Sequence, residues 1–349
     1  MTTASSPLPP LATALTALAA GRSLDETLTA QVFDVVMRGA ASPAQIGALL
    51  LALRVKGESV EELAGATRAL RAAMVPVESD GGQTIDTCGT GGGSVTTFNI
   101  STGAALVAAG AGAAVAKHGN RSFTSRCGSA DVLEALGVTI SLDGSTAARV
   151  LREARIAFLF APNFHPAMRH VAPVRRELGV PTLMNLLGPL ANPAGVRRQV
   201  IGVADAGRAP LVAGALARLG TDHALVVHGR VGMDEISPCG RSDVWEVRGG
   251  AVTHWEVDPA TLELAVEDPG ALAGEGPAEN AARLEGLLTG RTDDAPGRAA
   301  LLLNAGAAVY VAGLAPSYPA GIARAREALR SGAAAAALDS LRRAASTSG

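Results

Sequence analysis

The chain has 349 residues, 48% of them hydrophobic, and a formal net charge of −2. This length fits one large domain with a smaller one, and the hydrophobic content is ample for a substantial core. The near-neutral charge argues against a basic field that would hold nucleic acid, and no apolar stretch reaches the roughly twenty residues of a membrane span.

Cysteine usage points to the compartment. Cys88, Cys127 and Cys239 are an odd number with no C-x-x-C spacing, which favours reduced thiols over disulfides or a zinc site. The first residues lack the basic segment of a signal peptide. We therefore expect a cytoplasmic protein that has neither a membrane nor a nucleic acid as partner.

Residues 1–78 are expected to form a small helical domain, joined by helices from about 163–192. Ser23, Ser42 and Ser59 each stand three residues before Glu or Gln, a pattern typical of capping boxes that open helices. The apolar stripes of these helices fit a self-contained bundle packed on the large domain as well as a face buried against another subunit.

From Gln83 onwards, short apolar runs alternate with helical stretches, which indicates an α/β domain over 79–349 with a mostly parallel central sheet flanked by helices. The expected strands are 83–87, 113–117, 138–140, 157–160, 199–203 and 223–228, followed by a hairpin of 245–248 and 251–255. The expected helices are 102–110, 130–136, 146–153, 210–219, about 298–312 and about 320–345.

A glycine-rich turn organises the large domain. Segment 86–102 passes from a strand through Gly89, Gly91, Gly92 and Gly93 into a helix. Such a turn gathers backbone N–H groups and a helix N-terminus around one concavity, which suits an anion. The pattern matches neither G-x-x-x-x-G-K-[ST] nor G-x-G-x-x-G, so by itself it fits a structural turn as well as a phosphate site.

Two further polar segments favour the phosphate interpretation. Lys117 opens the polar segment 117–125 and is one of only two lysines, with Lys56, so it is a candidate point-charge ligand of phosphate. Asp234 and Glu235 also follow a strand closely. Because ligands bind beyond the carboxyl ends of parallel strands, the three segments should converge at one sheet edge. Adjacent carboxylates are usually solvated, but beside a diphosphate a Mg²⁺ site becomes the better interpretation.

Together with 180–193 and 232–237, these segments resemble the anthranilate phosphoribosyltransferases, over nearly the whole chain. The resemblance implies transfer of a 5-phosphoribosyl group from phosphoribosyl diphosphate to the amine of anthranilate, in tryptophan biosynthesis. It also implies two Mg²⁺ ions and a homodimer formed through the helical domain, and it leaves open an association with anthranilate synthase.

The resemblance assigns three sets of site residues. Those for phosphoribosyl diphosphate are Gly89, Gly92, Gly93, Thr97, Asn99, Ile100, Ser101, Thr102, Lys117, His118, Gly119, Asn120, Arg121, Ser122 and Ser129. Those for anthranilate are Gly89, Asn120, His165, Arg175, Gly188 and Pro189, with Gly188-Pro189 expected as a turn. Asp234 and Glu235 would bind one Mg²⁺, and Glu235 and Ser101 would share the second with the diphosphate.

Catalysis is expected to be electrostatic, without an acid or base residue. Mg²⁺, Lys117 and backbone amides would stabilise the leaving diphosphate, and the guanidinium fork of Arg175 suits the anthranilate carboxylate. For His118 and His165, a structural hydrogen bond is at least as good an interpretation as catalysis.

The chain departs from the family pattern at Gly93, where an Asp is usual, and at Met184, where Phe is frequent. Ser94 or Thr96 could replace part of the missing carboxylate's contacts. We expect activity to survive with an altered affinity for phosphoribosyl diphosphate.

Two other functions remain compatible with the sequence. A pyrimidine nucleoside phosphorylase has a related architecture, and phosphorolysis of thymidine or uridine would identify it. A non-catalytic, nucleic-acid-binding relative would show salt-dependent binding to DNA, although the near-neutral charge and the intact metal-type residues argue against it.

Overall fold

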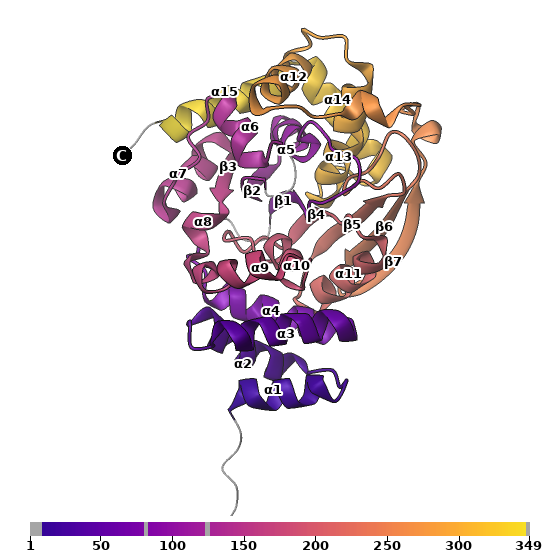
Figure 1. Cartoon of the computed structure of the whole chain (residues 1–349). Coiled ribbons are helices and arrows are strands. Elements are labelled where there is room, and N and C mark those ends of the chain that lie inside the picture. Colours follow the sequence, from indigo (N-terminus) through magenta and orange to yellow (C-terminus); the bar gives the residue numbers. More distant parts are fainter. Residues whose placement is uncertain (1–8, 80–82, 123–125, 347–349) are drawn as a thin grey trace, which may run out of the picture. The chain divides into compact units, whose positions relative to one another are not determined.

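The computed structural model describes residues 9–79, 83–122 and 126–346, which form two compact units. The first unit contains the residues up to Met74 together with His165–Ala191, and the second contains Val75–Phe164 and the chain from Asn192 onwards. The first division therefore lies at Met74, whereas the sequence placed it after residue 78. Figure 1 labels the elements of both units.

The first unit is entirely helical in its described residues. Its helices are α1 (Pro10–Ala19), α2 (Glu26–Met37), α3 (Pro43–Lys56), α4 (Val60–Ala72), α9 (Ala172–Leu178) and α10 (Met184–Leu190), with the 3₁₀ segment η1 (Pro166–His170). Ser42 and Ser59 form the expected capping boxes.

The expected cap at Ser23 is wrong. Helix α2 begins at Glu26, and the Asp25 side chain accepts the cap hydrogen bond from the Leu28 N–H. The buried Glu62 carboxylate accepts the Leu24 N–H at 2.9 Å, which holds the chain before the helix away from a cap at Ser23. The Ser23 hydroxyl instead accepts a hydrogen bond from Lys56 Nζ at 3.2 Å.

The second unit is built on a seven-stranded sheet in the order β3-β2-β1-β4-β5-β6-β7. Strands β1 to β5 are parallel, and β6 and β7 extend the sheet as an antiparallel hairpin. The strands are β1 (Thr84–Gly89), β2 (Ala114–Gly119), β3 (Ile156–Phe160), β4 (Arg198–Gly202), β5 (His223–Gly229), β6 (Ser242–Arg248) and β7 (Ala251–Val257). The predicted α/β class with a mostly parallel sheet is confirmed.

Helices flank this sheet. The α-helices are α5 (Ile100–Gly110), α6 (Ser129–Ala135), α7 (Gly144–Ala154), α8 (Ala161–Phe164), α11 (Ala209–Arg218), α12 (Pro277–Thr289), α13 (Ala295–Val311), α14 (Tyr318–Arg330) and α15 (Ala333–Ser346). Three 3₁₀ segments are η2 (Ala206–Arg208), η3 (Pro259–Leu262) and η4 (Pro269–Leu272). Helices α5 and α13 pack against each other and on the central strands, whereas α11 packs on β5 and β6.

The expected strand over 138–140 is wrong, because that segment is irregular. Val138 and Ile140 are buried in the core between α6 and α7. Their apolar character therefore reflects burial in a connection and not pairing in the sheet. Helix α12 was not anticipated, and the last expected helix is divided into α14 and α15 around Gly332, whose φ is +78°.

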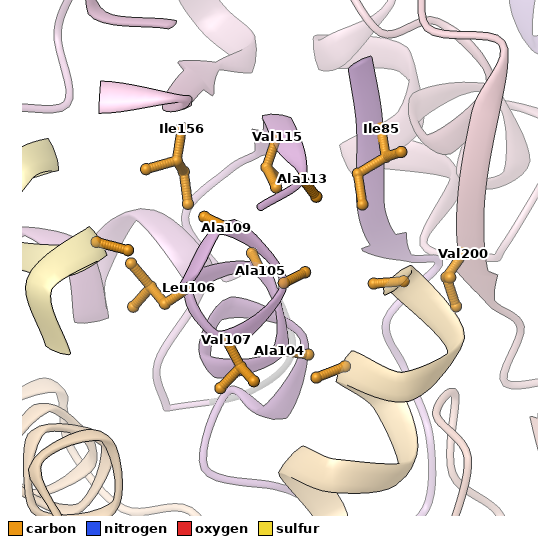
Figure 2. Packing of buried hydrophobic residues seen from close by; sticks show 14 of the residues in the cluster. Ile85, Ala104, Ala105, Leu106, Val107, Ala109, Ala113, Val115, Ile156 and Val200 are labelled. Atoms are coloured by element: carbon orange, nitrogen blue, oxygen red, sulfur yellow. The ribbon is translucent and has the colours of Figure 1, made fainter. Parts of the chain in front are cut away.

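Small side chains allow the close packing of the core. In Figure 2, Ala105, Leu106 and Ala109 of α5 lie near the strand residues Ile85, Val115 and Ile156. All these side chains are buried. The alanine-rich face lets the helix axis approach the sheet closely, and it fixes the position of the N-terminus of α5 beside the end of β1.

The strand order places a switch point between β1 and β4. From β1 the chain continues outward to β2 and β3 on one side, and β4 and β5 continue on the other side. At such a point the connections leave in opposite directions and open a crevice at the carboxyl ends of the strands. The glycine-rich turn follows β1 directly at this crevice.

Candidate active site at the carboxyl ends of β1 and β4

Two paired glycines end the central strands. Gly89 of β1 and Gly202 of β4 are in register. A Cβ atom on Gly202 would lie 1.5 Å from the Asp234 carbonyl oxygen, and one on Gly89 would lie 2.6 Å from Asp234 Oδ2. Glycine is therefore required at Gly202, where the Asp234 backbone lies directly across the strand end, whereas a Cβ at Gly89 would displace the Asp234 carboxylate.

The glycine-rich turn is joined to the same segment by backbone hydrogen bonds. The Gly91 N–H donates to Asp234 Oδ2 at 2.9 Å, and the Ser94 N–H donates to the Gly232 carbonyl at 2.9 Å. Gly91 and Gly92 have φ values of +66° and +81°, a region that favours glycine. A Cβ on Gly93 would lie 2.8 Å from the Gly232 carbonyl oxygen, so the missing family carboxylate coincides with a close approach of two loops.

The two adjacent carboxylates are held in protein. Glu235 is 8% exposed, and its Oε2 has no hydrogen-bond partner among the described residues. Burial, and then repulsion from Asp234, raise the pKa of Glu235 to about 8. Burial also raises the pKa of Asp234, against the lowering effect of the Gly91 N–H. An isolated buried carboxylate oxygen is costly, so this arrangement favours a cationic ligand.

The oxygen donors of Ser101, Asp234 and Glu235 fit Mg²⁺ better than they fit a metal that is bound by protein side chains alone. Among the described residues, no three His, Cys, Asp or Glu side chains gather as a metal cage. Mg²⁺ characteristically keeps waters and takes one or two carboxylates together with substrate phosphates. A cavity of about 10 Å³, room for about one water-sized sphere, is lined among others by Ser101, Asp234 and Glu235.

Lys117 lies buried beside this cavity. Its Nζ donates to the Thr87 carbonyl at 2.6 Å and to Ser101 Oγ at 3.3 Å. Burial lowers the pKa of Lys117, and the nearby Asp86 carboxylate opposes that effect. An ammonium has three donors, so one N–H remains beyond these two contacts. Lys117 thus ties β1 to the first turn of α5 and positions Ser101.

Asp86 is a buried partner of Lys117 that the sequence analysis did not identify. It accepts from the His118 N–H at 3.1 Å and from Asn192 Nδ2 at 2.8 Å. Asn192 also donates to the Ala116 carbonyl at 2.8 Å. This network holds β1, β2 and the chain after residue 191 together and supplies the negative charge that balances the Lys117 ammonium.

A second asparagine network fixes the start of α5. Asn99 has a left-handed backbone with φ of 66° and lies immediately before the helix. Its Nδ2 donates to the Cys127 carbonyl at 3.0 Å, and its Oδ1 accepts from Asn280 Nδ2 at 2.9 Å. Thr97 pairs with Ala273 in an isolated bridge. The buried hydroxyl of Thr102 has no partner among the described residues, so the helix N-terminus retains polar groups for a ligand.

Part of the polar segment after β2 is directed elsewhere. The guanidinium of Arg121 forms ion pairs with Asp131 at 2.7 Å and Glu134 at 2.6 Å, both on α6. The Ser129 hydroxyl donates to the Asn120 carbonyl at 3.3 Å, and a Cβ on Gly119 would lie 2.2 Å from that hydroxyl. Residues 123–125 lie outside the described part of the chain. In this conformation Arg121 therefore binds carboxylates and not an open anion site.

The residues expected for anthranilate are divided between the two units. Gly89 and Asn120 belong to the second unit, whereas His165, Arg175, Gly188 and Pro189 belong to the first. Burial lowers the pKa of His165 to about 4, so its imidazole is neutral at pH 7. Burial also lowers the pKa of Arg175. The expected Gly188-Pro189 turn is wrong, because both residues lie within α10. The helix tolerates Pro189, which has no N–H to donate, because this residue lies near the helix end.

The structure adds residues that the motifs did not predict. Asn304 of α13 accepts the Ile236 N–H at 3.0 Å and donates to the Ile236 carbonyl at 2.9 Å. It therefore fixes the residue that follows Glu235. A lone asparagine in an apolar helix, as at Asn304, was the available signal, because a buried amide needs partners. Gly202 gave no separate signal within its apolar strand.

Two family models match the chain and define its class. The glycosyl transferase family, a/b domain, matches residues 81–335, and the helical bundle domain of the same glycosyl transferase family matches 12–74. The chain is thus a glycosyl transferase of the type that joins a helical bundle to an α/β domain.

The relatives are more specific. Anthranilate phosphoribosyltransferase of Rubrobacter xylanophilus is 51% identical over 93% of this chain and 95% of its own. The anthranilate phosphoribosyltransferase of a Roseiflexus species is 51% identical over 92% of this chain and 94% of its own. The crystal structure of anthranilate phosphoribosyltransferase from Thermus thermophilus matches with a TM-score of 0.90 at 44% identity. The match covers 96% of this chain and 99% of that chain. The Saccharomyces cerevisiae enzyme in complex with phosphoribosyl diphosphate and Mg has a TM-score of 0.87 at 29% identity, covering 97% and 99%.

The chain therefore belongs to the anthranilate phosphoribosyltransferase family, which confirms the resemblance seen in the sequence. No helix among the described residues combines the length and the apolar character needed to cross a membrane.

Proposed function

We propose that this chain transfers the 5-phosphoribosyl group of phosphoribosyl diphosphate to the amine of anthranilate, giving N-(5-phosphoribosyl)anthranilate and diphosphate in tryptophan biosynthesis. The observation that carries the proposal is the buried Asp234-Glu235 pair, whose Glu235 Oε2 has no partner among the described residues. It lies against a glycine-rich turn at a sheet switch point. This arrangement suits a metal-bound diphosphate.

The phosphoribosyl diphosphate would bind along the turn after β1 and the first turn of α5. Backbone N–H groups from Gly91 to Gly93 and the N-terminus of α5 offer donors to the diphosphate. Lys117 Nζ donates to the Ser101 hydroxyl in the first turn of that helix. Releasing the Gly91 N–H from Asp234 would free both a phosphate donor and a carboxylate oxygen.

Asp234, Glu235 and Ser101 would hold Mg²⁺, and we propose two ions. Mg²⁺ supplies positive charge that stabilises the diphosphate as it leaves. The protein's contribution is to keep Glu235 desolvated, to hold Ser101 through Lys117, and to fix the next residue, Ile236, through Asn304. Its raised pKa means that Glu235 loses its proton when a cation binds.

The chemistry needs no nucleophilic side chain. The bond between C1 of ribose and the diphosphate oxygen breaks, and the anthranilate nitrogen forms the new bond to C1. The positive charge that develops on the ribose is balanced by the diphosphate, and the amine proton passes to solvent. Positioning and electrostatics therefore account for catalysis.

The acceptor, anthranilate, would be held by the residues that the family resemblance implies. We propose that Arg175 binds the carboxylate, with His165, Asn120, Gly89, Gly188 and Pro189 forming the rest of the acceptor site. The half-buried Arg175 has a pKa lowered by burial alone, and a desolvated guanidinium gains most from a planar carboxylate.

We further propose a cytoplasmic homodimer formed through the helical unit. Ala44, Ala48, Leu51 and Val55 are exposed on α3 and recur at helical spacing, and Val55 is 79% exposed. Such a stripe on one helix face suits burial against a second copy. The mass of the Leu51→Glu/Val55→Glu variant, measured by light scattering, should then be that of a monomer.

Anthranilate synthase is a candidate partner that co-purification would test.

The decisive experiment follows anthranilate fluorescence after phosphoribosyl diphosphate is added, with Mg²⁺ and with excess EDTA. We expect a decay that requires both the co-substrate and the metal. Glu235→Ala should abolish the decay, whereas Glu256→Ala, an exposed carboxylate on β7, should leave it intact. A folded protein that shows no decay would refute the proposed reaction.

A further inference from the structure

Asn99 stands at the cap position of α5 but does not cap this helix. Asparagine at such a position usually has an extended backbone, and its side-chain oxygen accepts a hydrogen bond from an N–H of the first helical turn. Here the backbone is left-handed, with φ of 66° and ψ of 46°, and the side chain makes no cap hydrogen bond. The first turn of α5 therefore lacks the side-chain acceptor that an asparagine cap normally supplies.

Two neighbours hold the Asn99 amide away from the helix. Its Oδ1 accepts from Asn280 Nδ2 at 2.9 Å, and its Nδ2 donates to the Cys127 carbonyl at 3.0 Å. Asn280 Oδ1 in turn accepts the Glu275 N–H at 2.8 Å. Because a backbone donor and a backbone acceptor stand at the two ends of this chain of hydrogen bonds, the orientation of both amides is determined.

Asn280 lies in a part of the chain that is closely joined to the segment before α5. It is the fourth residue of α12, and it is 2% exposed. Three residues further along α12, the Arg283 guanidinium lies 4.2 Å from the centroid of the Phe98 ring and donates to the Ala273 carbonyl at 3.1 Å. Thr97 pairs with Ala273 in an isolated antiparallel bridge. The start of α12 and the segment before it therefore hold the chain that leads into α5, and all these contacts lie within the second unit.

The uncapped start of α5 belongs to the candidate active site. Ser101, in its first turn, lines the small cavity together with Asp234 and Glu235. The Thr102 hydroxyl is buried and has no hydrogen-bond partner among the described residues. Backbone N–H groups at a helix start can bind phosphate oxygens, and an Asn99 side chain that capped the helix would occupy the same donors.

We propose that Asn280 is a positioning residue for the diphosphate of phosphoribosyl diphosphate, because it keeps the Asn99 side chain from capping α5. This role rests on the function proposed above, and Asn280 acts without touching the substrate. Removal of the Asn280 amide frees Asn99 Oδ1. A left-handed backbone is unfavourable for a residue other than glycine, so Asn99 returns to the extended form, caps the first turn and competes with the diphosphate.

Calorimetric titration with inorganic diphosphate in the presence of Mg²⁺ measures this competition without the reaction. Asn280→Ala should weaken diphosphate binding by about five- to tenfold, the equivalent of about one hydrogen bond. In steady-state assays, KM for phosphoribosyl diphosphate should rise by a similar factor, whereas KM for anthranilate should change by less than about twofold. Glu279→Ala, which removes an exposed neighbour on α12, is the control and should bind diphosphate like the parent protein.

A second background separates positioning from a purely structural role. The Asn99→Gly variant adopts the left-handed conformation without a side chain that could cap the helix. In that background, Asn280→Ala should change the diphosphate affinity by less than about twofold. If alanine disrupts the fold, Asn280→Asp keeps the volume and the acceptor for the Glu275 N–H, and it replaces only the donor to Asn99 by an oxygen. It should weaken binding more in the parent than in Asn99→Gly.

Two results would overturn the positioning role. One is an unchanged diphosphate affinity in Asn280→Ala. The other is an equal loss of affinity with and without Asn99→Gly, which would assign the effect to a general loosening of α12. A parent protein that binds diphosphate but does not consume anthranilate would contradict the proposed reaction alone, whereas a parent protein that binds no diphosphate would overturn both.

Discussion

Strand β4 carries opposite arrangements of charge at its two ends. At Gly202, the carboxyl end, backbone segments touch, and the acidic pair Asp234-Glu235 is enclosed in protein. At Arg198, the amino end, the basic residues Arg198, His223 and Arg248 line a cavity together with Asp222 and Tyr310. Burial raises the pKa of the acids at one end, and it lowers the pKa of the histidine at the other end. At both ends burial therefore disfavours the charged form of a titratable side chain, the carboxylates at the carboxyl end and the imidazole at the amino end.

The close approach at the carboxyl end is expected to be the least tolerant feature. Gly202→Ala would place a Cβ 1.5 Å from the Asp234 carbonyl oxygen, so the segment that carries Asp234 and Glu235 must move. We expect a loss of Mg²⁺-dependent activity of at least about a hundredfold and a destabilisation of about 1–3 kcal/mol or more. Denaturant unfolding and the fluorescence assay measure the two effects.

A matched control is Gly47→Ala on α3, where a Cβ makes only an ordinary contact of 3.7 Å with Val174. That variant should be as stable as the parent or slightly more so, because alanine favours helix. If Gly202→Ala behaved in the same way, the paired strand ends would not be the reason for the geometry of the carboxylates.

Asn304 should have the next largest effect, because it positions Ile236, the residue after the proposed metal ligand Glu235. Asn304→Ala leaves the N–H and the carbonyl of Ile236 without their side-chain partner, at a cost of about 1–3 kcal/mol. We expect the Mg²⁺ concentration for half-maximal activity to rise by about tenfold, with a smaller change in KM for anthranilate. Asn163→Ala, which removes hydrogen bonds to Ser141 and Leu142, is the control. Equal changes in both constants would contradict a positioning role.

Replacing the buried acid should stabilise the metal-free protein in alkaline solution. The folded pKa of Glu235 is about 8, above its usual 4.5, so the folded state holds the proton more tightly than the unfolded state. The stability linked to that proton is fully present below pH 4.5 and is lost as pH rises to 8. Glu235→Gln has no such loss. Its advantage over the parent should be small at pH 5 and largest near pH 8.5.

Thermal unfolding in EDTA at the two pH values measures this difference. Glu256→Gln on β7 is the control, since that carboxylate is exposed. An advantage of Glu235→Gln that stays constant with pH would show that packing, and not a buried charge, determines its effect.

The sequence predicted the candidate site at the carboxyl end of the sheet, but it did not predict that basic residues gather at the amino end. Gly89 and Lys117 stand near the carboxyl ends of β1 and β2, and Asp234 follows β5 after a short loop, so their convergence could be inferred from the rule for parallel sheets. Arg198, His223 and Arg248 are separated by 25 residues at each step, and only strand register brings them together. A sequence pattern with no local motif carries no information on register.

Supporting residues were missed for a related reason. Asn192, Asn280 and Asn304 each serve a partner far away in the chain, such as Asp86 for Asn192. Local capping signals were predicted where helix and cap are contiguous, as at Ser42 and Ser59. The predicted cap at Ser23 is wrong because the long-range contact of Glu62 with Leu24 determines where α2 begins. Tertiary contacts thus decide between local signals of similar strength.

The smallest expected effect concerns Gly93, where the family usually carries Asp. A Cβ there would lie 2.8 Å from the Gly232 carbonyl oxygen and 3.6 Å from Asp234 Oδ1. Gly93→Asp must therefore separate the glycine-rich turn from the segment Gly232 to Asp234 and add a negative charge beside Asp234. We expect KM for phosphoribosyl diphosphate to rise by about two- to tenfold, with kcat largely retained, in steady-state assays at saturating Mg²⁺. Gly93→Ala distinguishes the two causes, because it adds the Cβ without the charge. An equal rise in both variants would assign the effect to the close approach of the loops, and an unchanged KM in both would mean that the turn moves freely away from Gly232 when the substrate binds.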